Sequence, residues 1–105
     1  EAHFGVPMTK AVLHSINTRL DAAVIAFQLD HAETRIAIVD TEFSGVFREA
    51  LALARVKPLV IDFVDTQYPA DAPYPQGEPF GAVDYEAFVA GGDPEYAWAM
   101  PDDEW

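Results

Sequence analysis

The stretch RIAIVDTEFSGVFREALALARVKPLVIDFVD, residues 35–65, decides the fold. Its ends are short apolar runs rich in β-branched residues, at 35–40 and 57–64, and such runs favour strands buried on both faces. Between them, apolar residues recur at helical spacing, and Ser44 is placed to cap the first free N–H groups of that helix. A crossover of this length joins parallel strands. The stretch therefore predicts a strand, a helix and a second, parallel strand.

Another strand and helix are expected before this unit. Residues 10–17, KAVLHSIN, form an apolar run that predicts a strand. Asp21 is placed to cap the following helix, and Leu20 can pack on Ile25 as a hydrophobic staple. The expected order over residues 11–64 is thus β-α-β-α-β. The predicted fold class is α/β, with a parallel three-stranded piece of a doubly wound sheet.

The first residues carry a helix stop signal. In EAHFGVP, residues 1–7, Gly5 suits the left-handed closing position of a helix and Pro7 prevents its continuation. A stop signal without a preceding helix, on a chain that begins with Glu, indicates a piece cut from something longer. We therefore expect the chain to be a fragment.

The end of the chain differs in composition. Six of the eight prolines follow residue 65, interleaved with aromatic and acidic residues, which favours turns and extended segments. One short helix is predicted at 84–90, with Asp84 as its cap and Gly91 as its stop. We expect a single partial domain, with an α/β core at 1–65 and a Pro-rich acidic wrap at 66–105.

The net charge of −12 is unevenly distributed along the 105 residues. Residues 1–57 hold 7 acids and 6 bases, whereas residues 58–105 hold 11 acids and no base. An acidic surface of this kind repels phosphate backbones and anionic lipids. Nucleic acids and membrane surfaces are therefore not expected as partners.

The chain lacks cysteine, so it has neither a disulfide framework nor a thiolate metal site. It also has no run of the roughly 20 apolar residues that a membrane span needs, and no signal-like N-terminal segment. The expected location is the cytoplasm.

The predicted strands end in acids, Asp40 at the first and Asp62 with Asp65 at the second. Ligands of open α/β sheets bind at the carboxyl ends of the strands, which makes these acids candidates for a site. Aspartate is also a common turn former there, and we favour that interpretation. The turn DTEFSG, residues 40–45, contains one glycine and two acids that would repel phosphate, so no nucleotide site is predicted.

Other candidate groups are weaker. Residues 102–104, DDE, could hold a hard cation loosely but lack the spaced ligands and turn glycine of a calcium loop. His3, His14 and His31 are too scattered to form a metal site by local spacing. Two serines lack the setting of a nucleophile elbow: Ser15 and Ser44. We therefore assign no catalytic, cofactor-binding or metal-binding residue.

Several segments carry a family resemblance. They are FGVPMTKAVLHSINTRL at 4–20, IAFQLDH at 25–31, IVDTEF at 38–43, DYE at 84–86 and PDDEW at 101–105. These segments resemble the AMP-forming acyl-CoA synthetases of the adenylate-forming superfamily. The likeness covers nearly the whole chain and is greatest for fatty-acid and short- or medium-chain acyl ligases, including those acting on methylthio-propionate.

The resemblance implies a place within a larger enzyme. In that family, a large N-terminal domain of α/β layers carries the ATP and acyl sites, and a small mobile domain brings in a lysine. The present chain resembles an early part of the large domain, before the phosphate loop expected just after Trp105. The resemblance therefore implies that the chain is a scaffold fragment that is inactive alone, and that its partner is the remainder of the parent enzyme. ATP, Mg²⁺ and CoA are expected for that parent and no cofactor for this chain.

Two further expectations concern the isolated chain. A piece cut from a larger sheet has unpaired strand edges and uncovered apolar faces, so we expect it to form a homo-oligomer. The alternative to the ligase fragment is a stand-alone flavodoxin-like module. Such a module would use its aromatic, acidic second half for binding or protein interaction.

Overall fold

The computed structural model describes residues 1–73 and 75–99. The chain groups into two compact units. One is Thr18–Gly92, and the other combines Glu1–Asn17 with the chain from Asp93 onward. The predicted division of a single partial domain after residue 65 stays a prediction.

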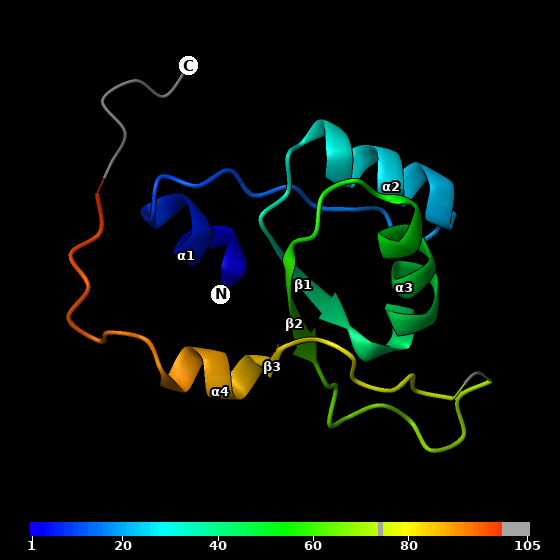
Figure 1. Ribbon diagram of the computed structural model, residues 1–105. Helices are drawn as coiled ribbons and strands as arrows, with labels where there is room; N and C mark the ends of the chain where they lie inside the picture. The colour runs from blue at the N-terminus through cyan, green and yellow to red at the C-terminus, as the bar shows by residue number, and fades with distance from the viewer. Residues whose placement is uncertain (74, 100–105) are drawn as a thin grey trace. The chain divides into compact units, whose positions relative to one another are not determined.

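A three-stranded parallel sheet forms the centre of the larger unit (Figure 1). Its order is β1-β2-β3, and the register aligns Ile36 with Leu59 and Asp40 with Phe63. The predicted strand, helix and parallel strand over residues 35–65 are confirmed. The bounds of the strands are β1 Ile36–Asp40, β2 Leu59–Phe63 and β3 Val83–Asp84.

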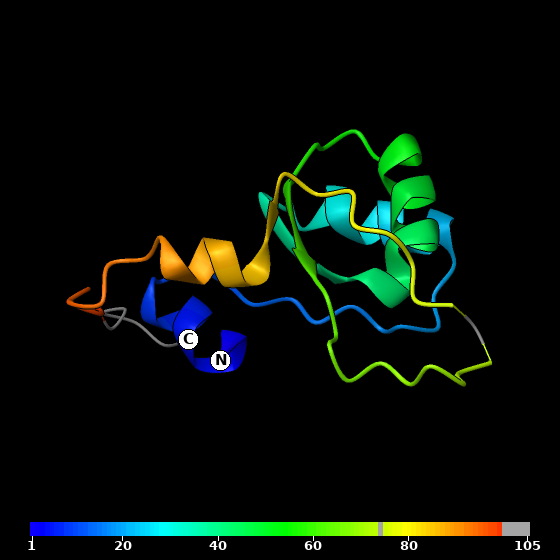
Figure 2. The ribbon, with the colours of Figure 1, turned by 90° about the horizontal axis from the view of Figure 1, so that it is seen from below.

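Two helices lie on the same side of this sheet, α2 (Ala22–His31) and α3 (Ser44–Leu53) (Figures 1 and 2). Helix α2 begins as predicted, because the Asp21 side chain accepts a hydrogen bond of 2.9 Å from the Val24 N–H. The apolar core contains residues of both helices and of β1 and β2: Ile25, Ala26, Leu29, Phe47, Ala50, Ala37, Val39, Val60 and Ile61.

The two faces of the β1–β2 layer differ. Along β1, Ala37 and Val39 are buried, whereas Ile36 is 53% and Ile38 42% exposed. The buried residues share a face with their register partners on β2, Val60 and Asp62, which are also buried. We call this the covered face. The opposite side, the open face, carries Ile36, Ile38, Leu59, Ile61 and Phe63, of which Ile61 is buried.

Ser44 is not the cap of α3, contrary to the prediction. A short 3₁₀ turn, η1 (Thr41–Phe43), comes first, and the Asp40 side chain caps it by accepting a bond from the Glu42 N–H. Ser44 is then the first helical residue, and Phe43 at the cap position makes no side-chain cap bond. The strand-end aspartate takes the capping role because the chain turns immediately after β1.

The third strand is not the predicted one. Residues 10–17 have no regular structure, and Val83–Asp84 supplies β3 instead. The Ala82 N–H donates to the Val60 carbonyl at 2.9 Å, just before this strand begins. A Cβ at Gly81 would lie 2.6 Å from the same carbonyl oxygen. Glycine therefore permits the close approach that brings β3 beside β2.

Helix α4 (Tyr85–Ala90) confirms the predicted short helix. The Asp84 side chain caps it by accepting a bond of 3.0 Å from the Ala87 N–H, and Gly91 follows the last turn. The Tyr85 ring meets the Phe63 ring edge-on, with centroids 5.7 Å apart. Helix α4 therefore packs against the carboxyl end of β2.

The smaller unit contains helix α1 (Ala2–Met8), which corrects the predicted stop at Gly5. Pro7 lies inside α1, where it removes one backbone donor close to the helix end. The left-handed closing residue is Lys10, with φ of 62°, and its N–H donates to the Pro7 carbonyl at 2.9 Å. A helix does end in this part of the chain, as predicted, but it ends at Met8, several residues later than expected.

The tail of the chain also contacts α1, because the Ala99 N–H donates to the Met8 carbonyl at 3.2 Å. None of the helices in the described part of the chain is long and apolar enough to cross a membrane.

Candidate functional site

The three strand-end acids lie at the carboxyl end of the sheet, as predicted. Two of them close local turns. The Asp40 side chain accepts a bond of 2.9 Å from the Glu42 N–H, and Asp65 accepts one of 2.8 Å from the Gln67 N–H. These are the turns that aspartate forms with backbone two residues on. Both carboxylates therefore help to shape the chain where it leaves a strand.

Asp62 has a different role, because it is only 4% exposed. Its Oδ2 accepts hydrogen bonds from the Phe80 N–H at 3.0 Å and the Gly81 N–H at 2.6 Å. Its buried Oδ1 has no hydrogen-bond partner among the described residues. Backbone N–H groups that point at a carboxylate make charge-assisted bonds. Asp62 thus ties β2 to the segment that enters β3.

Residues 76–82, which we call the strap, cross the carboxyl end of the sheet and lead into β3. Arg48 of α3 donates to the Glu78 and Pro79 carbonyls, both at 3.4 Å. Its guanidinium also lies 4.9 Å from the centroid of the Phe80 ring, which in turn contacts Phe47 at 6.5 Å between centroids. A cation over an aromatic face is attracted by the ring electrons. Arg48 therefore holds the strap onto α3.

The strap leaves little space beneath it. A Cβ at Gly77 would collide with the Thr41 carbonyl oxygen and with Ser44 Oγ, and both residues are buried. Gln76 Nε2 donates to the Asp65 carbonyl at 3.1 Å. The chain itself therefore fills the carboxyl end of β1, where a ligand of an open α/β sheet would bind.

Tyr68 lies before the strap and is half-buried. Burial raises the pKa of its hydroxyl above the ordinary value, and the negative charges of Glu42 and Asp40 raise the pKa further. The phenol therefore stays protonated near neutral pH.

A depression of about 200 Å³ lies between the end of β2 and α4. Its lining includes three acids, Asp62, Asp84 and Glu86, and neither lysine nor arginine. Small-molecule sites span about 300–1,000 Å³, and nucleotide phosphates require positive groups or backbone N–H donors. The depression does not fit a nucleotide.

The other predicted candidates are divided between the two units. His3, His14 and Ser15 belong to the smaller unit, whereas the ring of His31 stacks on Phe27 at the end of α2 with centroids 5.7 Å apart. Within residues 1–73 and 75–99, no group of three or more histidines or acids could hold a metal ion. The acids at 102–104 lie outside the described residues.

Comparison with known proteins gives matches along the whole chain. It is 38% identical over 111 residues to an acetate–CoA ligase of Humulus lupulus and 40% identical over 112 residues to a peroxisomal acetate/butyrate–CoA ligase of Arabidopsis thaliana. Each match covers 100% of this chain and 20% of the relative. The chain belongs to the acyl-CoA ligase family.

This ligase-family chain spans about a fifth of the length of those curated relatives. A third relative is a peroxisomal benzoate–CoA ligase of Arabidopsis thaliana, 37% identical over 94 residues that cover 90% of this chain and 16% of that ligase. No family model and no solved structure matches the chain.

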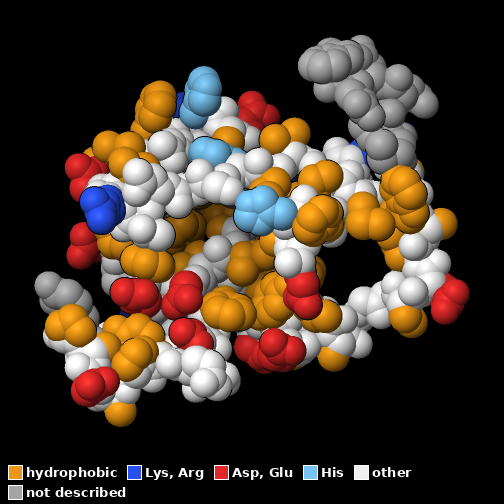
Figure 3. Space-filling view, turned by 180° about the vertical axis from the view of Figure 1, so that it is seen from behind, with side chains coloured by type: hydrophobic (Ala, Val, Ile, Leu, Met, Phe, Trp, Pro, Cys, Tyr) orange, Lys and Arg blue, Asp and Glu red, His pale blue; other side chains and the backbone are white. Residues whose placement is uncertain are grey.

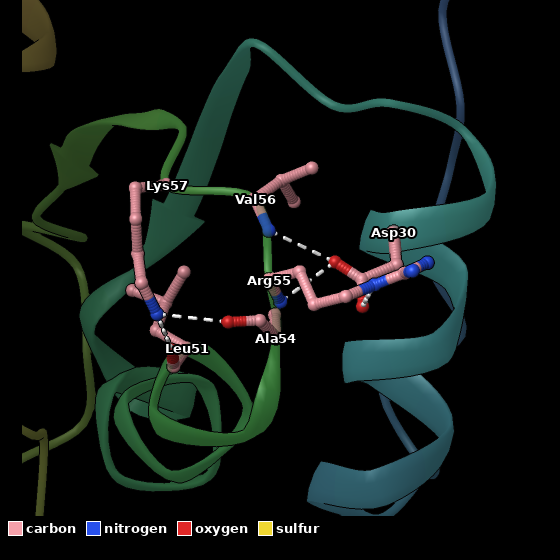
Figure 4. A network of polar contacts seen from close by, with 6 residues as sticks. All are labelled: Asp30, Leu51, Ala54, Arg55, Val56 and Lys57. Atoms are coloured by element: carbon pink, nitrogen blue, oxygen red, sulfur yellow. Dashed lines mark hydrogen bonds and ion pairs between the residues drawn. The ribbon is translucent and has the colours of Figure 1, made fainter.

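A polar joint at the other end of the sheet was not anticipated from the sequence (Figure 4). Asp30 of α2 accepts bonds from the N–H groups of Arg55 at 2.8 Å and Val56 at 2.9 Å, after α3 has ended. The Val56 N–H is the main reason why the pKa of Asp30 lies below its usual value, and it outweighs the opposing effect of burial. Arg55 Nε adds an ion pair of 3.2 Å.

Sequence reasoning missed three long-range contacts of this ligase-family chain, made by Asp30, Arg48 and Tyr68. Arg48 and Phe80 are 32 positions apart, so no local pattern joins them. The sequence offered only two signals of this contact: a single arginine among the apolar positions of a predicted helix, and a phenylalanine in a Pro-rich segment. The contacts of Asp30 and Arg48 position backbone.

Proposed function

We propose that this chain is part of the large domain of an AMP-forming acyl-CoA ligase, where it serves as scaffold rather than as the catalytic centre. The observation that carries the proposal is the match along the whole chain to ligases named for acetate, butyrate and benzoate. In the proposed reaction, a carboxylic acid and ATP form an acyl-adenylate and diphosphate. CoA then displaces AMP to give the acyl-CoA.

We propose that ATP, Mg²⁺ and CoA bind to the remainder of the parent enzyme. Phosphoryl chemistry needs a metal ion and positive groups around the phosphate oxygens. Here the carboxylates of Asp40, Asp62 and Asp65 accept backbone hydrogen bonds, and the depression beside α4 is lined by acids. These contacts support a scaffold role and offer no group that would cradle a phosphate.

Three finer features belong to the same proposal. We propose that the sheet is a piece of a doubly wound sheet in the parent, and that residues 66–105 wrap its surface. The contacts of Asp62 and Arg48 with the strap support the second part. We also propose a cytoplasmic location, which the absence of cysteine supports, although several relatives have names that include the word peroxisomal. Imaging of the parent protein with a fluorescent tag would distinguish the two compartments.

A chimera tests the scaffold proposal. The matching 111 residues of the Humulus lupulus acetate–CoA ligase are replaced by this chain, and acetyl-CoA formation is measured. We expect activity within about tenfold of the unmodified ligase, because a scaffold segment affects the reaction only through position. A matched control carries Leu29→Ala in the inserted segment and should lose thermal stability before it loses affinity for ATP.

A folded but inactive chimera would contradict the proposal and would favour the stand-alone binding module. Circular dichroism and a single thermal transition establish that the chimera is folded. In parallel, titration calorimetry of the isolated chain with Mg²⁺-ATP should show no binding at micromolar concentrations. Micromolar affinity would place a nucleotide site in this segment and would contradict the scaffold role.

A further inference from the structure

The depression between the end of β2 and α4 combines aromatic and acidic side chains, and we call it the acidic depression. Its lining includes the rings of Phe63 and Tyr85, which meet edge-on with their planes at 75°. The face of an aromatic ring carries partial negative charge and attracts a cation. The aromatic part of the lining therefore favours a positively charged ligand.

The acids of the lining are placed close together by the sheet. Asp62 and Asp84 are register partners on β2 and β3, so their side chains lie on the same face. Glu86 follows in the first turn of α4. Like charges on neighbouring strands repel each other, and a cation between them removes the repulsion. The acids therefore favour the same kind of ligand as the rings.

The buried carboxylate of Asp62 is only partly satisfied by the chain. Its Oδ2 accepts the Phe80 and Gly81 N–H groups, whereas its Oδ1 has no hydrogen-bond partner among the described residues. A buried charge is costly unless it is paired. Residues 58–105 contain neither lysine nor arginine, so no base from this half of the chain neutralises the three acids. The strap buries Asp62, so the need for a cation arises from contacts within this chain.

We propose that the acidic depression binds the guanidinium group of an arginine side chain from another polypeptide segment. A guanidinium is planar, so it can stack on a ring while its N–H groups bond carboxylates in pairs. The ammonium of lysine is a compact charge and does not combine these contacts. In the described part of the chain, no group of three acids could hold a metal ion, which favours an organic cation.

The size and charge of the depression indicate a side chain rather than a free metabolite. Its volume of about 200 Å³ is below the roughly 300–1,000 Å³ of small-molecule sites, and it suits the end of one side chain. Free arginine also carries an α-carboxylate, which the three acids repel. The inference does not depend on the proposed ligase function, because it concerns contacts within residues 62–86.

A titration followed by nuclear magnetic resonance tests the proposal. The labelled chain is mixed with the blocked tripeptide acetyl-Gly-Arg-Gly-amide, and the amide shifts are recorded. We expect shifts concentrated at residues 62–66 and 84–86, with a dissociation constant of about 1 mM that rises with salt. Shifts confined to other residues would overturn the proposal.

Three matched ligands separate the guanidinium from other causes of binding. The same tripeptide with citrulline has a similar shape without the charge, and it should bind at least about tenfold more weakly. The lysine tripeptide has the charge without the planar group and should also bind more weakly. Equal binding of either tripeptide would overturn the assignment to a guanidinium. Free L-arginine should bind less tightly than the blocked tripeptide, and tighter binding would assign the site to a free amino acid instead.

Variants of the chain locate the site. Asp84→Asn keeps a side-chain oxygen for the cap of α4 and removes the charge, so it should weaken binding at least about fivefold. Glu86→Gln gives the same test without changing the cap. The matched control is Glu49→Gln, an equal change of charge on the exposed side of α3, which should change affinity less than about twofold. Equal weakening in all three variants would show attraction to the net charge alone and would overturn the proposal. Circular dichroism checks that each variant remains folded.

Discussion

The covered and open faces of the β1–β2 layer are built from alternate residues of the same two strands, yet they have different surroundings. Val39 on the covered face is buried, whereas its neighbour Ile38 on the open face is 42% exposed. Figure 3 shows other places where apolar side chains of the molecule reach the surface. Both residues are β-branched, so strand propensity does not distinguish them. The difference teaches that stability is concentrated on the covered face.

The largest expected effect is on the covered side. Leu29 of α2 is 1% exposed, so Leu29→Ala should lower the free energy of unfolding by about 2–5 kcal/mol through lost apolar contact and the cavity left behind. Phe27→Ala, on the exposed side of the same helix, should cost less than about 1 kcal/mol. Urea unfolding followed by circular dichroism measures both. Equal losses would remove the distinction between the two sides.

The second effect concerns the polar anchor of the covered face. Asp62→Ala removes the acceptor of the Phe80 and Gly81 N–H groups and should cost about 2–3 kcal/mol. Asp65→Ala removes a carboxylate that accepts the local Gln67 N–H in an exposed turn and should cost less than about 1 kcal/mol. Hydrogen exchange should show faster exchange at Phe80 and Gly81 in the first variant. Unchanged exchange there would contradict the anchoring role.

A pair of glycine substitutions has a smaller effect and opposite signs. Gly81→Ala places a methyl group 2.6 Å from the Val60 carbonyl oxygen, so it should destabilise the chain by about 1–3 kcal/mol. Gly45→Ala lies in α3 with no atom within 4 Å of the added carbon, and it should stabilise by about 0.4–1 kcal/mol. Thermal unfolding compares the two. Stabilisation by Gly81→Ala would mean that β3 does not need a close approach to β2.

The smallest effect is a dependence on pH at the joint between α2 and the end of α3. The pKa of Asp30 is lowered in the folded chain, chiefly by the Val56 N–H. A lowered pKa contributes stability above the ordinary carboxyl value, and this contribution is lost as the pH falls through the folded-state pKa. Asp30→Asn should therefore be less stable than the parent chain at pH 7, with the difference shrinking below about pH 4. Asp71→Asn, in an exposed turn, is the control for the same change of charge, and an equal loss of stability in both variants at pH 7 would contradict the role of Asp30.

Local patterns were sufficient for part of the fold. The alternation of apolar runs with a helical stretch predicted β1, α3 and β2. The caps Asp21 and Asp84 were also predicted, because a capping side chain acts locally: each accepts a hydrogen bond from the N–H three residues on. The positions of Asp40, Asp62 and Asp65 at one end of the sheet followed from the parallel order. That these acids have no catalytic role stays a prediction.

Other features depend on contacts that no local pattern records. Residues 10–17 have the composition of a strand but no ladder, because composition does not supply a partner. Gly81 allows β3 to lie beside β2, because a side chain at this position would collide with the Val60 carbonyl. The neighbours of Gly81 in the sequence do not indicate this contact. The contact of Arg48 with Phe80 likewise joins residues that only the folded chain brings together.

The chain has two lysines, Lys10 and Lys57, and their amines differ chemically. Lys57 Nζ donates to the Leu51 carbonyl at 2.5 Å and the Ala54 carbonyl at 2.8 Å, where it satisfies acceptors at the end of α3 (Figure 4). Both lysines are exposed, so the two hydrogen bonds of Lys57, and not burial, distinguish them. An amine held by carbonyl oxygens is a poor nucleophile toward acylating reagents. Limited treatment with an activated ester should therefore place a fluorophore on Lys10 and the terminal amine in preference to Lys57, which gives a simple route to selective labelling of the smaller unit.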